Sequence, residues 1–142
     1  RLPATRLDTC KMAVRFLVLH RDRSIRLVTE GLGPKPFHGR IAMLVNEHTL
    51  SAGEMVAAFA KENRLARIVG TRTGGQVLGG ANFTVGQGFV IRFPAAGWYS
   101  WSGAIVEGCG VQPDVDVPLS TNALRGGKDN QLQTAVAEVQ TM

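Results

Sequence analysis

The sequence has 142 residues, of which 44% are hydrophobic and 19% charged, as is ordinary for one globular domain. Its formal net charge is +5, but the basic residues form no stripe with interleaved aromatic residues, so we expect no nucleic-acid partner. No apolar run approaches the ~18 residues of a membrane-spanning helix. Cys10 and Cys109 form no CxxC pair, so the sequence predicts no zinc site. We expect two buried free thiols, with a Cys10–Cys109 disulfide as the alternative that the sequence leaves open.

The first part of the chain combines helical spacing with a weak hairpin pattern. Apolar residues at Cys10, Ala13, Val14 and Leu17 follow the i, i+3, i+4, i+7 spacing of an amphipathic helix, so we predict a helix within residues 7–19. Residues 25–29 alternate weakly and predict the return strand of a hairpin. Glycines and prolines in residues 31–39 indicate a loop.

A strand–helix–strand unit follows this loop. Residues 41–45 are a continuous apolar run, which predicts a strand buried on both faces. After Ser51 the apolar residues have helical spacing, and residues 65–69 predict a second strand. A unit of about 30 residues has the size of a parallel crossover, so we expect an α/β fold. Ser51 then lies near the carboxyl end of a strand, where open α/β sheets usually place chemistry.

The rest of the chain predicts a hairpin, a short strand and a final helix. Residues 71–80 hold four glycines, but their spacing does not match the dinucleotide fingerprint, so no nucleotide cofactor is expected. Residues 83–97 alternate around the turn Gly86-Gln87-Gly88, which predicts a β-hairpin. Val115 and Val117 indicate a short strand, and residues 130–139 have the apolar face of a helix.

Two interpretations of Ser51 remain open on local pattern. Ser51 and Glu54 before an apolar run form the capping-box pattern, which is the commoner reason for a serine at a helix start. The same place suits a nucleophile, because the free amides and dipole of a helix N-terminus favour a developing oxyanion. Thr49 stands where the nucleophile-elbow pattern G-x-S-x-G requires glycine, so that motif is not matched.

A serine nucleophile needs a base, and the pattern selects none. His20, His38 and His48 lie in or beside turns and loops, with no spacing that favours one of them. Lys61 falls on the helix that Ser51 begins, nearly three turns away at a rise of ~1.5 Å per residue. Glu107 could orient a histidine as the third member of a triad, although an isolated carboxylate is more often a surface residue.

Four motifs occur in order within about residues 39–119. They are an asparagine at a strand end, a Thr-x-Ser-Ala-x-Glu turn, a Val-Gly-x-x-Thr-x-Gly loop and a Gly-x-x-Pro-Asp segment, here Asn46 and residues 49–54, 69–75 and 110–114. Together they resemble the carboxyl-terminal processing, or tail-specific, serine peptidases. The resemblance implies a crotonase-like or ClpP-like β-β-α spiral, with residues 1–142 forming a single domain that is the carboxyl-terminal portion of the catalytic domain. It also implies a protein or peptide substrate, no cofactor or metal, and an exported or periplasmic location.

By this resemblance Ser51 is the nucleophile, and the amide of Ala52 is one oxyanion donor. Bacterial processing peptidases place a lysine base in Thr-x-Gly-Lys, but Gln76 occupies that position here and cannot accept the proton. A second branch, resembling the tricorn core proteases, uses an upstream histidine with a downstream glutamate, and Glu107 resembles that glutamate. The histidine and the second oxyanion donor belong upstream of this chain, so we expect the isolated chain to be inactive.

Two functions from different classes follow from these residues. The first is a serine endopeptidase that acts on protein substrates and takes its histidine from outside this chain. The second is a catalytically inactive homologue that binds peptides or serves as a structural module. The missing lysine favours the second, whereas the retained Ser51 and Glu107 favour the first. An acyl-CoA enzyme of the crotonase fold shares only the fold class.

Overall fold

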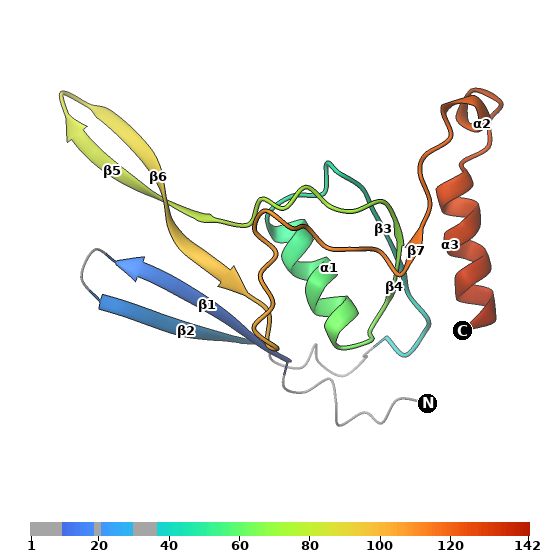
Figure 1. Ribbon diagram of the computed structural model, residues 1–142, viewed down its shortest axis with the longest axis horizontal. Helices are drawn as coiled ribbons and strands as arrows, with labels where there is room; N and C mark the ends of the chain where they lie inside the picture. Colours follow the sequence, from blue (N-terminus) through green and yellow to red (C-terminus); the bar gives the residue numbers. More distant parts are fainter. Residues whose placement is uncertain (1–9, 19–20, 30–36) are drawn as a thin grey trace.

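The computed structural model describes residues 10–18, 21–29 and 37–142, and their side chains from residue 37 onward. These residues form a mixed α/β structure with two sheets, of strand order β2-β1-β6-β5 and β3-β4-β7 (Figure 1). The strands are β1 (Cys10–Val18), β2 (Arg21–Thr29), β3 (Ala42–Val45), β4 (Arg67–Gly70), β5 (Gly79–Gly86), β6 (Phe89–Tyr99) and β7 (Val115–Asp116). The helices are α1 (Ala52–Glu62), α2 (Thr121–Arg125) and α3 (Asn130–Thr141).

The three-stranded sheet confirms the predicted strand–helix–strand unit. Strands β3 and β4 are parallel, with Ala42 opposite Arg67 and Val45 opposite Gly70, and α1 connects them. Strand β7 is parallel to β4 on its other side. Helices α1 and α3 lie on opposite sides of this sheet (Figure 1), and α3, the predicted final helix, contacts β3 and β4. None of the helices in the described residues is long and apolar enough to cross a membrane.

One hydrophobic core joins the two sheets. Helix α1 buries the small residues Ala57 and Ala60, which allow its axis to approach the sheet closely. Trp98 of β6, in the other sheet, is buried in the same cluster. The buried members of the cluster are Val45, Ala57, Ala60, Ala66, Ile68, Val77, Trp98, Val106 and Val111.

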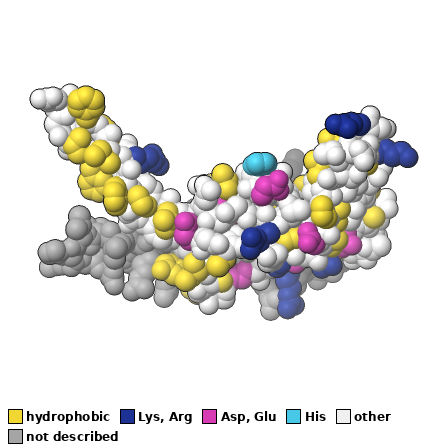
Figure 2. Space-filling view, turned by 45° about the horizontal axis from the view of Figure 1, so that its top comes forward, with side chains coloured by type: hydrophobic (Ala, Val, Ile, Leu, Met, Phe, Trp, Pro, Cys, Tyr) yellow, Lys and Arg dark blue, Asp and Glu magenta, His cyan; other side chains and the backbone are white. Residues whose placement is uncertain are grey.

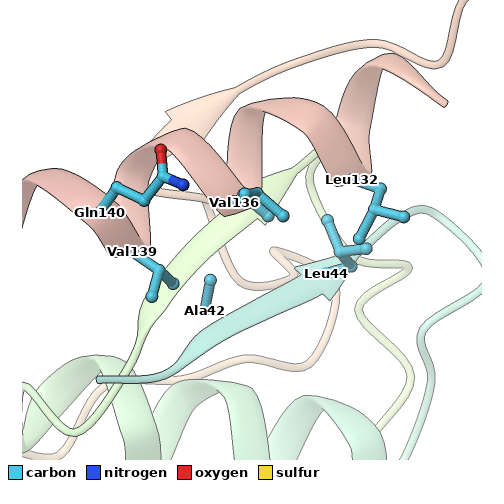
Figure 3. A pocket seen from close by; sticks show the side chains of 7 residues that line it. Ala42, Leu44, Leu132, Val136, Val139 and Gln140 are labelled. Carbon is cyan, nitrogen blue, oxygen red and sulfur yellow. The ribbon is translucent and has the colours of Figure 1, made fainter. Parts of the chain in front are cut away.

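The prediction that residues 41–45 are buried on both faces is wrong. Val45 is 4% exposed, but Leu44 is 43% and Ile41 40% exposed. Among the described residues β3 has a neighbouring strand on one side only, and α3 covers its outer face only in part. A groove of about 400 Å³ remains between them (Figure 3), lined by Ala42, Leu44, Leu132, Ala135, Val136, Val139 and Gln140.

The helix predicted within residues 7–19 is also wrong where it is described. Residues 10–18 form strand β1, which pairs antiparallel with β2 from Cys10 opposite Thr29 to Val18 opposite Arg21. The return strand of the hairpin is confirmed and begins earlier than predicted. The sequence carries a competing period of two, because every second residue is apolar: Cys10, Met12, Val14, Phe16 and Val18. Pairing with β2 and β6 favours this period over the helical one.

Strands β5 and β6 form the predicted β-hairpin, with its turn at Gln87 and Gly88. The hairpin projects from the core as an arm (Figure 1), and hydrophobic side chains gather along it (Figure 2). Phe83, Phe89 and Phe93 are 46%, 68% and 61% exposed. A two-stranded ribbon is at best marginally stable alone, so the base of this arm must be held by the core.

Glu62, in the last turn of α1, holds the segment that follows β6. Its carboxylate accepts hydrogen bonds from the Ser100 hydroxyl at 3.2 Å, the Trp101 amide at 3.1 Å and the Ser102 amide at 2.6 Å. Burial raises the pKa of Glu62, but the hydrogen bonds to its carboxylate lower the pKa by more, so the net pKa lies below its ordinary value. The carboxylate therefore fixes the carboxyl end of α1 to the arm.

Candidate functional site

The turn between β3 and α1 presents Ser51, and its own side chains shape it. The Asn46 side chain accepts a hydrogen bond from the His48 amide at 3.0 Å, as in an Asx-turn. The Thr49 amide donates to the Asn46 carbonyl at 2.9 Å, and the Thr49 hydroxyl accepts from the Asn46 amide at 3.1 Å. These contacts explain why an asparagine and a threonine precede the serine.

Ser51 has an unusual backbone conformation, with φ 53° and ψ −119°. The Gly53 amide donates to the Leu50 carbonyl at 3.0 Å, so Ser51 is the first central residue of a type II′ turn, a position that glycine normally occupies. Such a conformation costs about 1–3 kcal/mol in a non-glycine residue. An N-cap residue normally has extended backbone angles. The predicted capping box between Ser51 and Glu54 is nevertheless present, although the contact from the Glu54 amide to the Ser51 hydroxyl lacks the geometry of a full hydrogen bond. The exposed hydroxyl therefore caps α1 only weakly.

The amide of Ala52 is a free donor beside that hydroxyl. Ala52 is the first residue of α1, and its amide has no acceptor among the described residues. The next two amides are occupied, since Gly53 donates to Leu50 and Glu54 to the Ser51 carbonyl. The positive end of the helix dipole adds to the potential here, so negative charge that develops near Ser51 is favoured.

Glu54 connects this turn to the loop that follows β4. Its side chain is 0% exposed. One carboxylate oxygen, Oε1, accepts from the Thr73 hydroxyl and the Gly75 amide, both at 2.6 Å. The other, Oε2, accepts from the Gln76 amide at 2.7 Å and the Ser51 amide at 3.2 Å. The Ser51 amide also donates to the Gln76 carbonyl at 2.9 Å, so the backbone of Gln76 lies directly against Ser51.

Glu54 is held in its ionised form by these donors. Burial raises the pKa of Glu54, but hydrogen bonds from the Thr73 hydroxyl and from three backbone amides lower it by more, so the net pKa lies below 4.5. No ion pair to Glu54 occurs among the described residues. Neutral donors alone therefore stabilise a buried charge at the start of α1.

Glu107 lies against the residues that follow Gln76. Its Oε2 accepts from the amides of Val77 at 2.7 Å and Leu78 at 3.1 Å. The Gly108 amide donates to the Gly75 carbonyl at 2.8 Å, which fixes the turn after Glu107 to the same loop. Adjacent residues thus connect the candidate positions, because Gln76 bonds to Ser51 and Val77 bonds to Glu107.

No basic side chain among the described residues forms a hydrogen bond with Ser51, and His38 is exposed. His48 is exposed and faces Glu47, with 3.7 Å between Nε2 and Oε1, while His20 lies outside the described residues. Lys61 is paired with Asp114 at 3.2 Å, away from the helix start. Gln76, which the resemblance places where the processing peptidases have a lysine, has an exposed side chain that carries no basic nitrogen. The described contacts therefore identify no base for Ser51.

Two other expectations concern thiols and metals. Cys109 was expected to be buried, but it is a free, exposed thiol because it lies in the turn after Glu107. The side chain of Cys10 lies outside the described ones. Within residues 37–142, no cluster of histidine, cysteine and carboxylate side chains could hold a metal ion.

The sequence interpretation missed what Glu54 and Thr73 do. Glu54 was assigned only the capping-box contact with the Ser51 amide, which is its longest hydrogen bond. Thr73 was part of a motif without a structural role. A signal was available, since both residues belong to the motifs of the resemblance and a carboxylate within an apolar helix face requires buried donors.

Comparison with known proteins identifies the family. Residues 11–117 match the model of peptidase family S41. The chain belongs to peptidase family S41. It is 36% identical over 101 residues to tricorn protease homolog 1 of Streptomyces coelicolor, and 30% identical over 99 residues to the carboxy-terminal-processing protease of Bartonella bacilliformis. A solved structure from Parabacteroides merdae, described as a candidate peptidase, has a TM-score of 0.76 at 16% identity, which shows a shared fold.

These similarities cover most of this S41 chain but only part of each relative. The matched regions are 70% and 61% of this chain, and they are 10% of the Streptomyces relative and 23% of the Bartonella relative. The structural match covers 96% of this chain and 45% of the Parabacteroides chain. This chain therefore spans less than half the length of each of these three proteins.

The strained turn predicts an unusual effect of glycine at position 51. Ser51→Gly should raise the free energy of unfolding by roughly 1 kcal/mol over Ser51→Ala, because glycine adopts a positive φ without the penalty of a side chain. Urea unfolding of the two variants measures this difference, and alanine is the matched control because it lacks the hydroxyl but keeps Cβ. A glycine variant less stable than the alanine variant would show that the turn is not strained.

The lowered pKa of Glu54 predicts a pH dependence of stability. Its pKa is about 4.5 when unfolded and lower when folded, so its contribution is complete above pH 4.5 and is lost as pH falls through the folded value. The difference in free energy of unfolding between the wild type and Glu54→Gln should therefore be largest near neutral pH and shrink below pH 4.5. Glu47 and Glu62 also titrate there, but they do so in both proteins. A difference that does not change with pH would contradict an ionised Glu54.

Proposed function

We propose that the full-length protein containing this chain is a serine endopeptidase that cleaves protein substrates near their carboxyl ends, as the tail-specific members of its family do. Ser51 is the nucleophile and the Ala52 amide is one donor to the oxyanion. Glu107 orients a histidine supplied from outside the described residues. The observation that carries the proposal is the strained, exposed Ser51 beside the free Ala52 amide at the start of α1.

The chemistry follows the general course of acyl transfer. Ser51 Oγ attacks the carbonyl carbon of the scissile peptide bond, while its proton passes to the imidazole. The carbonyl oxygen becomes an oxyanion, which the Ala52 amide stabilises together with a second donor from elsewhere in the protein. The imidazole then protonates the leaving amine, and water hydrolyses the resulting ester at Ser51.

Gln76 favours the histidine-dependent version over a serine–lysine dyad. Its side-chain amide cannot remove a proton, so the position of the family's lysine contributes its backbone and not a base. Glu107 supports the same choice, because its Oε2 is occupied by two amides while Oε1 has no partner among the described residues. One carboxylate oxygen thus remains for an imidazole N–H.

Three further statements belong to the same proposal. The complete domain has the crotonase-like β-β-α spiral, which is supported by the parallel β3–α1–β4 unit with Ser51 after a strand end. Residues 1–142 form a single domain that is the carboxyl-terminal portion of the catalytic domain. An exported or periplasmic location accords with the resemblance to the tail-specific peptidases.

A fluorophosphonate probe tests the nucleophile on the full-length protein. We expect one probe molecule to attach to Ser51, with formation of the oxygen–phosphorus bond and loss of fluoride, and Ser51→Ala should abolish the labelling. Ser120, which caps α2, serves as the control position, since Ser120→Ala should be labelled normally. If the folded wild type is not labelled at any pH, the protein is an inactive homologue and the proposal is wrong.

The role of Glu107 can be tested separately. Glu107→Gln should lower kcat by orders of magnitude, because a neutral amide stabilises the imidazolium poorly and can favour the wrong tautomer. Asp129, the N-cap of α3, provides a control carboxylate far from Ser51 in the sequence, and Asp129→Asn should leave kcat unchanged. An unchanged kcat in Glu107→Gln would exclude it as the orienting group.

A further inference from the structure

We propose that Glu54 is a positioning residue of the peptidase site, whose buried carboxylate fixes the Ser51 turn against the segment that carries Gln76 and Val77. This inference rests on the proposed function, in which Ser51 is the nucleophile. Glu54 itself need not touch the substrate. It acts through the backbone of Ser51, to which it bonds directly, and through the loop of residues 73–76.

The surroundings of Glu54 require both oxygens of its carboxylate to be hydrogen-bond acceptors. The amides of Ser51, Gly75 and Gln76 can only donate. The Thr73 hydroxyl has one hydrogen and already accepts from the Val111 amide at 2.7 Å, so it must donate to Glu54. Four donors thus face the two carboxylate oxygens. A glutamine would turn an NH₂ group toward two of these donors, which would then lose the side-chain oxygen that accepts their hydrogen bonds.

The arrangement fixes the active geometry as well as the fold. The Ser51 amide is shared between Glu54 Oε2 at 3.2 Å and the Gln76 carbonyl at 2.9 Å, so both contacts act on the residue whose φ is 53°. Without the carboxylate, Ser51 could relax toward ordinary backbone angles, which would redirect its hydroxyl relative to the Ala52 amide. The same loop continues into Val77, whose amide binds Glu107. Glu54 therefore sets the position of the nucleophile relative to both other groups.

The chain contains a matched control on the same helix. Glu62 lies at the opposite end of α1, and its carboxylate also accepts hydrogen bonds from a serine hydroxyl and backbone amides. Its partners belong to residues 100–102 at the base of the arm, and none of them contacts Ser51. Glu62→Gln should therefore cost stability without affecting the nucleophile, whereas Glu54→Gln should affect both.

The experiment compares Glu54→Gln and Glu62→Gln in the full-length protein. For each variant we would measure the melting temperature, the rate constant of fluorophosphonate labelling at Ser51, and kcat and KM for a peptide that the wild type cleaves. We expect both melting temperatures to fall. In Glu54→Gln the labelling rate constant and kcat should drop about 100-fold per folded molecule, with KM changed less than about threefold. In Glu62→Gln the labelling rate constant should stay within about twofold of the wild type, because the contacts that are lost lie at the opposite end of α1 from Ser51.

Thr73 provides a second test that remains decisive if Glu54→Gln does not fold. Thr73→Ser keeps the hydroxyl that donates to Glu54, and Thr73→Val removes it with little change in shape. The labelling rate constant should fall about tenfold in Thr73→Val and change little in Thr73→Ser, as expected for loss of one charge-assisted hydrogen bond. Equal rate constants in the valine and serine variants would overturn the proposal, as would a Glu54→Gln rate constant equal to that of Glu62→Gln.

The two proposals fail in distinguishable ways. A folded wild type that is never labelled overturns the peptidase function, and the positioning role falls with it. A labelled wild type whose Glu54 and Thr73 variants react at the normal rate overturns only the positioning role and leaves Ser51 as the nucleophile.

Discussion

A charge buried at the start of α1 is the constraint on which the site depends. An ionised carboxylate removed from water is tolerated only where donors surround it, and the donors to Glu54 come from two segments, the Ser51 turn and residues 73–76. Satisfying the charge therefore forces these segments together. Glycines permit the approach, because a Cβ at Gly110, whose φ is +66°, would lie 2.2 Å from the Thr73 carbonyl oxygen. One interaction thus determines where the turn, the loop and the segment after Glu107 meet.

The scaffold explains how a strained serine can persist. Strain of about 1–3 kcal/mol is maintained only where the surroundings over-determine the conformation. Here the parallel pairing of β3 with β4 fixes one side of the turn, and the packing of α1 through Ala57 and Ala60 fixes the other. The strained turn leaves the Ser51 hydroxyl with only a weak capping contact, exposed beside the free Ala52 amide. The strained backbone of Ser51 lowers the stability of the fold, and its hydroxyl stays exposed to solvent.

The sequence predicted the elements whose periodicity had no competitor. The β3–α1–β4 unit, the β5–β6 hairpin and α3 were all expected, and the four candidate site residues lie in or beside motifs that the fold places close together. The prediction was wrong for residues 10–18, where two periods coexist and partner strands decide between them. It also overestimated the burial of β3, because the coverage by α3 depends on tertiary packing. The Glu54 contacts were not predictable from local pattern, since their partners lie about 20 positions away in the loop after β4.

The central claim is that Ser51 is a nucleophile whose oxyanion is received by the Ala52 amide, with Glu107 completing the site through a histidine from elsewhere in the protein. A crystal structure of the full-length protein after reaction with a fluorophosphonate tests this most directly. The account predicts phosphorus bonded to Ser51 Oγ, a phosphoryl oxygen about 3 Å from the Ala52 amide, and an imidazole between Ser51 and Glu107. An adduct on another residue, or a phosphoryl oxygen directed away from the Ala52 amide, would contradict it.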